Sequence, residues 1–296
     1  MGPVRLGMAL RPSVYSPSEA VRIISSLDSV DSISNIFLPD VAGSPDPIEV
    51  SLAGLRASGR LYVGTGVIRM VEHDPKTLLR RIETIQSLSG NRFVLGVGTG
   101  RAGPDPRAAI DEMLTKLSTL KSGLASERMP KTYIATLKAG IAKRVAGHSD
   151  GILLNFCPAG YAAELIREYR KAYVGQTDFA CYVKVFYSQR NGRAERLLVE
   201  EFRLYDSYRQ YHSMFERQGM GTEIAQAVST LSSDSVKIPE AMFSVCLANP
   251  SPEELKERID DMRKAGVTLP CVYPYFDAGE DPDYRVKTTQ HIAQEL

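Results

Sequence analysis

The chain has 296 residues, of which 43% are hydrophobic and 24% are charged, so we expect a sizeable core and no bulk disorder. The 36 basic and 35 acidic residues give a formal net charge of +1, and no basic stripe indicates a nucleic-acid partner. No apolar run approaches the roughly 20 residues of a membrane span, and the first residues lack the pattern of a secretion signal. These features predict a cytoplasmic protein that binds a small molecule and neither a membrane nor nucleic acid.

The four cysteines, Cys157, Cys181, Cys246 and Cys271, lie far apart in the sequence. Their spacing matches neither a metal site nor a disulfide framework. Three of them lie inside apolar runs, where a free cysteine packs as a small hydrophobic side chain. We therefore expect plain buried thiols and no metal.

Helix starts recur along the chain as Ser or Asp followed by Pro. The side chain of the first residue accepts a free backbone N–H, and Pro gives up a donor that has no partner in the first turn. A glutamate three residues after the cap, as at Glu19, Glu49 and Glu254, predicts a capping box. The six predicted starts are Ser16-Pro17, Asp46-Pro47, Asp74-Pro75, Asp105-Pro106, Ser251-Pro252 and Asp281-Pro282.

The first four starts are spaced by roughly 30 residues, the length of one strand-helix unit, and a short apolar run precedes each. The predicted strands are apolar on both faces and are never joined by hairpin turns, which is typical of a parallel sheet covered by helices. Eight units favour closure into a (β/α)8 TIM barrel of the α/β class over an open doubly wound sheet. The strands are predicted at 4–10, 33–39, 61–67, 92–98, 132–137, 151–156, 179–187 and 269–276.

A single domain spanning 1–296 is predicted, because we find no linker or low-complexity segment. The irregular stretch 191–249 predicts two helices inserted before the last strand and packed outside the barrel. Aromatic residues recur there at helical spacing, which is more typical of packing or a subunit interface than of a cofactor site. A homodimer is the default expectation. These aromatic residues are Phe202, Tyr205, Tyr208, Tyr211 and Phe215.

Ligands of such barrels bind where the strands end, on the loops that lead into the helices. Glycines crowd the ends of the third and fourth strands, where they let the backbone approach a ligand closely. The candidate positions are Arg11, Asp40, Gly64 to Arg69, Gly98 to Arg101, Thr136 to Gly140, Asn155 and the loop after Phe276.

The stretch from Gly98 to Gly103 also matches the GxGxxG pattern of dinucleotide-binding folds. That pattern requires an acidic residue at the end of the next strand, where it holds a ribose. Here the next strand ends in Leu137-Lys138, and the match falls in the fourth unit instead of the first. We therefore favour the barrel over a dinucleotide-binding domain.

The segment VGTGVIRMVEHDP…LSGNRFVLGVGTG, within 63–100, resembles the luciferase-like oxidoreductases, and most of all their F420-dependent glucose-6-phosphate dehydrogenases. The segments 131–156 and 33–43 are similar to neighbouring blocks of the same family. The likeness covers roughly the first half of the chain, and beyond residue 160 only the order of the elements agrees. It implies a barrel that binds the deazaflavin F420, with FMN as the alternative.

The resemblance assigns a cofactor contact at the end of the third strand. Gly66-Val67 falls where the family has a non-proline cis peptide that backs the cofactor ring, and Gly64 and Thr65 precede it. Glycines at a strand end weaken the strand unless the backbone there adopts an unusual course. We therefore predict a cis bond between Gly66 and Val67.

Further cofactor contacts are implied at the next three strand ends. Thr99 and Gly100, which follow Gly98, fall where the family contacts the deazaflavin. The loop after the fifth strand matches the segment that receives the phosphate side of the cofactor, where a lysine and free backbone N–H groups suit an anion. The residues predicted there and after the sixth strand are Thr136, Leu137, Lys138, Gly140 and Asn155.

Asp40 matches the family's acid at the end of the second strand and is predicted as the catalytic residue. The alternative is a loop aspartate that satisfies local backbone N–H groups. His73, beside a helix start, is interpreted as structural. Arg11 and Arg101 are predicted substrate-binding residues.

Two residues depart from the sugar-phosphate dehydrogenases of the family. Val41 stands where those enzymes have a histidine, and Arg101 stands where they have a glutamate. Those two residues supply proton-transfer groups, so the resemblance does not extend to glucose-6-phosphate oxidation. The acidic-His-His pattern of the oxygen-activating members is also absent.

A reductase similar to the methylenetetrahydromethanopterin reductases needs less from the protein, because the deazaflavin carries the hydride. The sequence therefore favours an F420-dependent oxidoreductase acting on a small organic substrate. The alternatives are an FMN-dependent luciferase-like oxidoreductase or monooxygenase, and a non-catalytic barrel that binds a ligand.

Overall fold

The computed structural model describes residues 5–100, 105–233 and 235–296. Within these ranges eight parallel strands close into a barrel in the order β1, β2, β3, β4, β5, β6, β7, β9, and β9 pairs back with β1. The predicted (β/α)8 barrel is confirmed, and each predicted strand is found. The strands are β1 (Leu6–Ala9), β2 (Ile33–Leu38), β3 (Tyr62–Arg69), β4 (Phe93–Gly98), β5 (Lys131–Ala135), β6 (Gly151–Asn155), β7 (Asp178–Tyr187) and β9 (Leu269–Phe276).

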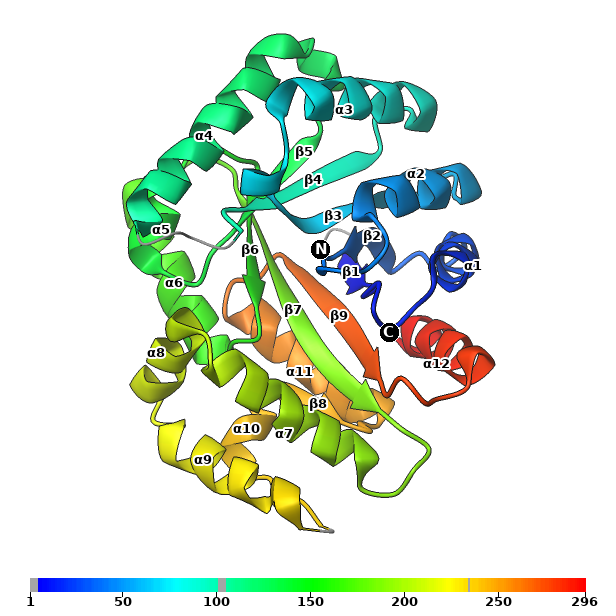
Figure 1. Cartoon of the computed structure of the whole chain (residues 1–296), viewed down its shortest axis with the longest axis vertical. Coiled ribbons are helices and arrows are strands. Elements are labelled where there is room, and N and C mark those ends of the chain that lie inside the picture. The colour runs from blue at the N-terminus through cyan, green and yellow to red at the C-terminus, as the bar shows by residue number, and fades with distance from the viewer. Residues whose placement is uncertain (1–4, 101–104, 234) are drawn as a thin grey trace.

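Helices surround the barrel, as Figure 1 shows, and connect each strand to the next. They are α1 (Pro17–Leu27), α2 (Pro47–Ala57), α3 (Pro75–Ser89), α4 (Pro106–Gly123), α5 (Ala139–Arg144), α6 (Ala159–Ala172), α11 (Pro252–Lys264) and α12 (Pro282–Glu295). Three short 3₁₀ turns, η1 (Met70–Glu72), η2 (Ser126–Arg128) and η3 (Thr230–Ser232), complete the connections described.

All six predicted helix caps form, with the Ser or Asp side chain accepting a backbone N–H in each case. Complete capping boxes are present at Ser16 and Ser251. The third predicted box is wrong: Glu49 instead accepts a hydrogen bond from Arg81 Nη2 at 2.7 Å. Arg81 lies on the neighbouring helix α3, so this partner could not be found from the local pattern.

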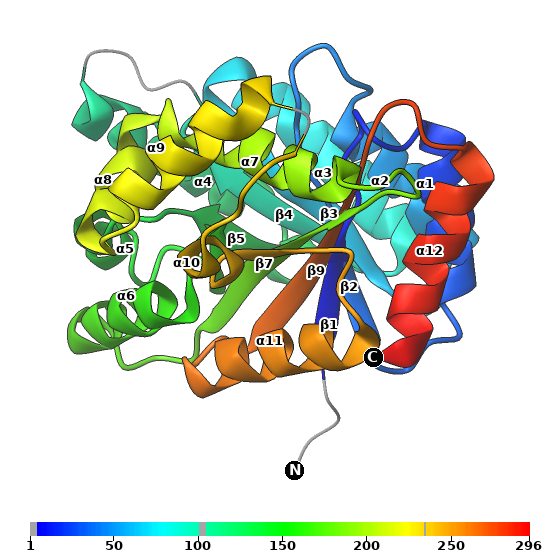
Figure 2. The same cartoon turned by 90° about the horizontal axis from the view of Figure 1, so that it is seen from below.

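The insertion between β7 and β9 is more divided than the two predicted helices. Its described part contains α7 (Arg193–Asp206), α8 (Arg209–Arg217), α9 (Gly221–Ser229), α10 (Glu240–Phe243) and a short strand β8 (Cys246–Ala248) that pairs with β7. The two-helix prediction is wrong because Gly219, at φ 72°, ends α8 in the left-handed conformation. Figure 2 shows α7, α8 and α9 on the side where β7 and β9 end.

The aromatic residues of the insertion mostly pack, as predicted. Phe202 and Phe215 are fully buried, and their ring centroids lie 4.7 and 6.1 Å from that of Phe156. Tyr208 is 45% exposed. Phe156 directly follows β6, so this aromatic cluster fixes α7 and α8 over the end of the barrel.

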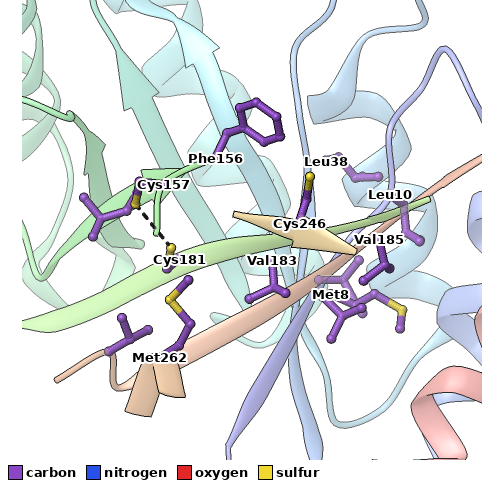
Figure 3. Packing of buried hydrophobic residues seen from close by; sticks show 14 of the residues in the cluster. Met8, Leu10, Leu38, Phe156, Cys157, Cys181, Val183, Val185, Cys246 and Met262 are labelled. Atoms are coloured by element: carbon purple, nitrogen blue, oxygen red, sulfur yellow. Dashed lines mark hydrogen bonds between the residues drawn. The ribbon is translucent and has the colours of Figure 1, made fainter. Parts of the chain in front are cut away.

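Two apolar clusters fill the molecule, one between strands and helices and one inside the barrel. Figure 3 shows part of the first, with Val183 and Val185 of β7 facing outward. All four cysteines are free and buried, as predicted, and the sulfurs of Cys157 and Cys181 lie 3.9 Å apart. The inner cluster comprises Ala9, Phe37, Val94, Tyr133, Leu153, Ala180, Tyr182, Leu269, Cys271 and Tyr273.

A buried ion pair lies above the inner cluster. Lys184, fully buried, continues the inward series of Ala180 and Tyr182 on β7 and pairs with Glu201 of α7, which is 5% exposed. Its ammonium group also donates to Tyr205 Oη at 2.9 Å. Burial lowers the pKa of Lys184, but Glu201 and Tyr205 together outweigh this and raise the pKa above its ordinary value. Lys184 therefore carries its charge inside the barrel.

Two arginines fasten the opposite end of the barrel, where the strands begin. Arg92 donates to the carbonyls of Leu55, Ser58 and Leu61, and Arg60 donates to those of Leu27, Asp28, Val30 and Ile33. These carbonyls lie at the helix ends and loops that precede the strands, so each guanidinium ties several of these segments together. Both arginines therefore stabilise the end of the barrel at which the strands begin.

We predict that Glu201→Gln destabilises the protein by about 3–5 kcal/mol, because it leaves the Lys184 charge buried without an anion. The double variant Lys184→Met/Glu201→Gln should be more stable than Glu201→Gln alone, because it removes that charge. Urea unfolding measures both. The control is Asp261→Asn, which breaks an exposed pair with Lys264 at 3.5 Å and should change stability by about 1 kcal/mol or less. Equal effects of Glu201→Gln and Asp261→Asn would contradict the analysis.

A pH dependence is predicted at Asp28. Burial raises the pKa of this carboxyl, but hydrogen bonds from Gly59, Ser58 and Arg60 outweigh it and lower the pKa to about 2. Because the folded pKa lies below the unfolded value of about 3.9, the stabilisation is complete above that value and is lost as the pH falls toward 2.

Asp28→Asn should therefore lower the free energy of unfolding at pH 7 by about 1–3 kcal/mol. The difference from the wild type should shrink when both proteins are unfolded in urea at pH 3. Asp31→Asn, at an exposed position on the next turn, should show little difference at either pH. A deficit of Asp28→Asn that stays constant from pH 7 to pH 3 would refute this assignment.

Candidate functional site

The strand ends meet at one mouth of the barrel, and β3 departs from regular geometry there. The peptide bond between Gly66 and Val67 is cis, as predicted. The pairing with β4 moves from Thr65 opposite Leu95 to Ile68 opposite Val97, so β3 carries an extra residue. Such a bulge bends a strand and redirects its side chains.

At the bulge, the Thr65 side chain supplies the hydrogen bonds to β4 that the backbone would make in a regular strand. Its hydroxyl donates to the Gly96 carbonyl at 2.8 Å and accepts the Gly96 N–H at 3.0 Å. The side chain is fully buried, and both of its hydrogen bonds are made within the sheet. Thr65 was predicted as a cofactor contact, and the structure places it behind the wall of the mouth.

The glycines around the bulge are required by close packing. A Cβ atom at Gly66 would lie 2.0 Å from Tyr182 Oη, and one at Gly64 would lie 1.7 Å from the Val94 carbonyl oxygen. On β4, a Cβ at Gly96 or Gly98 would lie 3.0 or 3.1 Å from the Val67 side chain. Gly98 therefore makes room for Val67, which is half-buried at the mouth, and Gly96 makes room for Val67 and for the Thr65 carbonyl oxygen, 2.3 Å from such a Cβ.

Hydrogen bonds from two other strands hold the bulge. Tyr182 of β7 donates its hydroxyl hydrogen to the Gly66 carbonyl at 2.7 Å, and the Asp40 N–H after β2 donates to the Val67 carbonyl at 3.3 Å. Both carbonyl groups beside the Gly66-Val67 bond are thereby satisfied. Tyr182 was missed from sequence, although its inward position follows from the alternation of β7.

The Asp40 carboxylate is bound by Arg69. Its two oxygens accept from Arg69 Nε at 3.0 Å and Nη2 at 3.1 Å, and the Arg69 backbone N–H lies 3.3 Å away. This hydrogen bond to Asp40 raises the pKa of Arg69. The carboxylate is therefore held by a residue 29 positions away and not by backbone N–H groups of its own loop, as the alternative interpretation of Asp40 had it. His73, just after η1, is half-buried, and burial lowers its pKa.

The end of β4 provides a second part of the mouth. Thr99 and Gly100 are both half-buried. Gly100 has φ 78°, and a Cβ there would lie 2.8 Å from Val71 Cγ1. Both the conformation and the space therefore favour glycine at this position. The predicted substrate residue Arg101 lies outside the described residues.

The loop after β5 is more open. Lys138 is exposed and precedes α5, and Gly140 has open space around it. The Thr136 hydroxyl accepts the Lys138 N–H at 3.1 Å, which shapes the turn. Leu137 is buried, and its carbonyl accepts from Tyr161. Of these predicted cofactor residues, Lys138 and Gly140 are exposed, Thr136 is half-buried and Leu137 is buried.

The far side of the mouth is polar and takes residues from the insertion. Asn155 Nδ2 donates to Tyr205 Oη at 3.0 Å and to Tyr211 Oη at 2.9 Å. Asn155 Oδ1 is buried without a hydrogen-bond partner among the described residues. Tyr205 and Tyr211 were predicted to pack, but their hydroxyl groups belong to the site.

Arg11, predicted to bind substrate, follows β1 and faces the same cluster. Its Nη1 lies 3.4 Å from Glu201 Oε1, and its guanidinium carbon lies 5.1 Å from the centre of the Tyr275 ring. Sequence reasoning missed Lys184, Glu201, Tyr273 and Tyr275. The inward alternation of β7 and β9 is the signal that could have located the three strand residues.

The mouth therefore has an apolar wall at β3 and β4 and charged, aromatic groups at β1, β7, β9 and α7. In the ranges the structure describes, no cluster of three or more His, Cys, Asp or Glu side chains could hold a metal ion. None of the helices described combines the length and hydrophobicity that crossing a membrane requires.

The sequence matches no protein-family model, and no curated protein shows significant similarity to it. The structure is similar to the F420-dependent tetrahydromethanopterin reductase of Methanopyrus kandleri, with a TM-score of 0.69 and 13% identity over 100% of this chain and 99% of that one. An F420-dependent secondary alcohol dehydrogenase, solved with an F420-acetone adduct, gives a TM-score of 0.70 at 13% identity over 99% of both chains.

A third solved structure binds a different flavin-type group. The oxygenating constituent of 3,6-diketocamphane monooxygenase from Pseudomonas putida, solved with FMN, has a TM-score of 0.66 and 15% identity over 99% of this chain and 98% of that one. At such identities the likeness establishes the fold. Over its whole length the chain thus has the barrel shared by F420-dependent enzymes and FMN-dependent monooxygenases.

Proposed function

We propose that the protein is an oxidoreductase that holds the deazaflavin F420 at the mouth of the barrel and acts on a small organic substrate. The observation that carries this proposal is the bulged end of β3, where the half-buried Val67 side chain packs over Gly96 and Gly98. The solved structures of the same fold whose names include F420 or FMN support it.

The residues at the mouth fit a flat ring with an anionic tail. Val67 would lie against one face of the ring, and the close-packed backbone at Gly100 would border it. Lys138 and Gly140, which are exposed after β5, would receive the phosphate side. When bound, the cofactor supplies the hydride chemistry, and the protein supplies orientation and electrostatics.

Asp40 has a positioning role in this proposal. Its carboxylate holds Arg69, and its backbone N–H holds the Val67 carbonyl, so it ties β2 to the bulge. Both oxygens of the carboxylate are thereby occupied by the Arg69 guanidinium. Asp40 therefore sets the position of Val67.

An FMN-dependent oxidoreductase or monooxygenase is the second candidate. The similarity to the FMN-bound monooxygenase constituent, whose TM-score of 0.66 is close to those of the F420-dependent enzymes, favours keeping it. In both candidates the cofactor ring would lie against Val67. The two cofactors differ in the phosphate-bearing tail, which the loop after β5 would bind. Cofactor titration separates them.

We predict that F420 binds more tightly than FMN, followed by the change in cofactor absorbance; the chain contains no Trp that quenching could report. Lys138→Ala should weaken F420 binding by about tenfold to a hundredfold, because a charge-assisted phosphate contact is worth about 1.5–3 kcal/mol. The preference for F420 should shrink in that variant. Lys264→Ala, which removes a 78% exposed lysine of α11, should bind F420 as the wild type does.

Micromolar FMN binding without F420 binding would replace the first candidate by the second. If neither cofactor binds, the barrel holds a different kind of ligand and the proposal fails. Circular dichroism of each variant confirms that the fold is retained.

A further inference from the structure

We propose that Arg11 binds an anionic group of the substrate, so that the substrate is an organic anion. That the bound anion is a substrate rests on the proposed function. That an anion binds here follows from the charges and hydrogen-bond donors at the mouth. Arg11 lies at the end of β1, with Tyr275 of β9 under its guanidinium and Glu201 of α7 beside it.

The charged cluster at the mouth has one positive charge in excess. Arg11 and Lys184 are cations, and Glu201 is the one carboxylate among the described residues within 4.0 Å of either. Lys184 is the closer partner of Glu201, which leaves Arg11 with a single contact at 3.4 Å. Glu200, the next carboxylate along α7, is paired with Arg193 at 3.1 Å.

The surrounding tyrosines cannot supply the missing negative charge. Burial raises the pKa of Tyr273 and of Tyr275 above their ordinary value, and both hydroxyls stay protonated at neutral pH. The side chain of Arg11 is only 16% exposed, so water compensates its charge incompletely. A partly buried cation without a full counter-charge favours an anionic ligand.

Arg11 also keeps hydrogen-bond donors for such a ligand. Its Nε is buried and has no partner among the described residues. A guanidinium presents its N–H groups as a planar fork that matches the two oxygens of a carboxylate or a phosphoryl group. The Tyr275 ring, 5.1 Å from the guanidinium carbon, limits the orientation of this fork. Lys184 and Glu201 act as positioning residues behind it.

The anion at Arg11 is distinct from the cofactor phosphate proposed at Lys138. β1 and β5 stand four places apart in the closed ring of eight strands, so Arg11 and Lys138 lie on opposite sides of the mouth. The bulge on β3 stands midway between them along the ring. A ring held against Val67 would therefore have its tail toward β5 and the substrate anion toward β1.

Benzoate and benzamide test the proposal, because they share shape and differ in charge, and the rings of Tyr205, Tyr273 and Tyr275 suit an aromatic probe. Binding is titrated by ligand-observed NMR at constant ionic strength, with the purified full-length protein. Benzoate should bind about tenfold or more tightly than benzamide, the factor that corresponds to about 1.4 kcal/mol. In Arg11→Gln the affinities for benzoate and benzamide should lie within about twofold of each other, and Arg11→Lys should keep part of the preference for benzoate.

Phenyl phosphate identifies the kind of anion. Tighter binding of benzoate assigns a carboxylate, and tighter binding of phenyl phosphate assigns a phosphoryl group; each supports the anion site if it depends on Arg11. Arg203→Gln, at an exposed position of α7, is the control and should leave every affinity unchanged. Equal binding of benzoate and benzamide to the wild type would overturn the proposal, and so would a preference that survives Arg11→Gln.

Titration of Arg11→Gln with F420 separates this proposal from the proposed function. The affinity for F420 should stay within about twofold of the wild type. If Arg11→Gln weakens the binding of F420 but leaves the binding of benzoate unchanged, Arg11 binds the cofactor phosphate and the proposed substrate site is refuted. If no cofactor binds but the benzoate preference depends on Arg11, the proposed function fails and the anion site stands.

Discussion

Tyr182 reaches from β7 across the interior of the barrel and donates a hydrogen bond to the Gly66 carbonyl on β3. This contact is possible because residue 66 has no side chain, since a Cβ there would lie 2.0 Å from the Tyr182 oxygen. The Asp40 N–H holds the next carbonyl, that of Val67, from the side of β2. Three strands thereby set the position of one valine side chain. The glycines of β4 then follow, because that side chain needs the space above them.

The two halves of the mouth differ in the physical nature of their surfaces. On the β3 and β4 side, hydrogen bonds within the sheet use the polar groups and leave Val67 as the surface. On the β1, β7 and β9 side, charged and hydroxyl groups lie inside the barrel. There a hydrogen bond or ion pair is stronger than in water, and a polar group without a partner destabilises the fold. The pairing of Lys184 with Glu201 makes this possible, because it neutralises the deeper cation and leaves Arg11 in front.

The architecture could be predicted from sequence because its signals are local. Each helix start is marked by a cap and a proline, and each strand by a short apolar run, so eight units could be counted. The site was predicted less completely, because its polar half depends on alternation along β7 and on contacts with the insertion. Lys184 meets Glu201 across 17 positions and Arg11 meets it across 190. Neither pairing has a local pattern that a single sequence displays.

The most specific part of the resemblance, the stretch NRFVLGVGTG, is largely explained by the fold. Asn91 adopts a positive φ, Arg92 fastens loops at the far end of the barrel, and Gly96 and Gly98 make room for Val67. Such residues are expected in any chain that builds this bulged barrel, whatever its substrate.

The groups that distinguish this chain lie mostly outside the resembling segments, on β7, β9 and α7. Arg11 stands beside them on β1, which pairs with β9. Val67 on β3 offers a surface for a flat ring, and Arg11, two strands away on β1 and without a full counter-charge, decides what can lie beside that ring. The polar half of the mouth is therefore assembled from both ends of the chain, because Arg11 meets Glu201 and Tyr275 there.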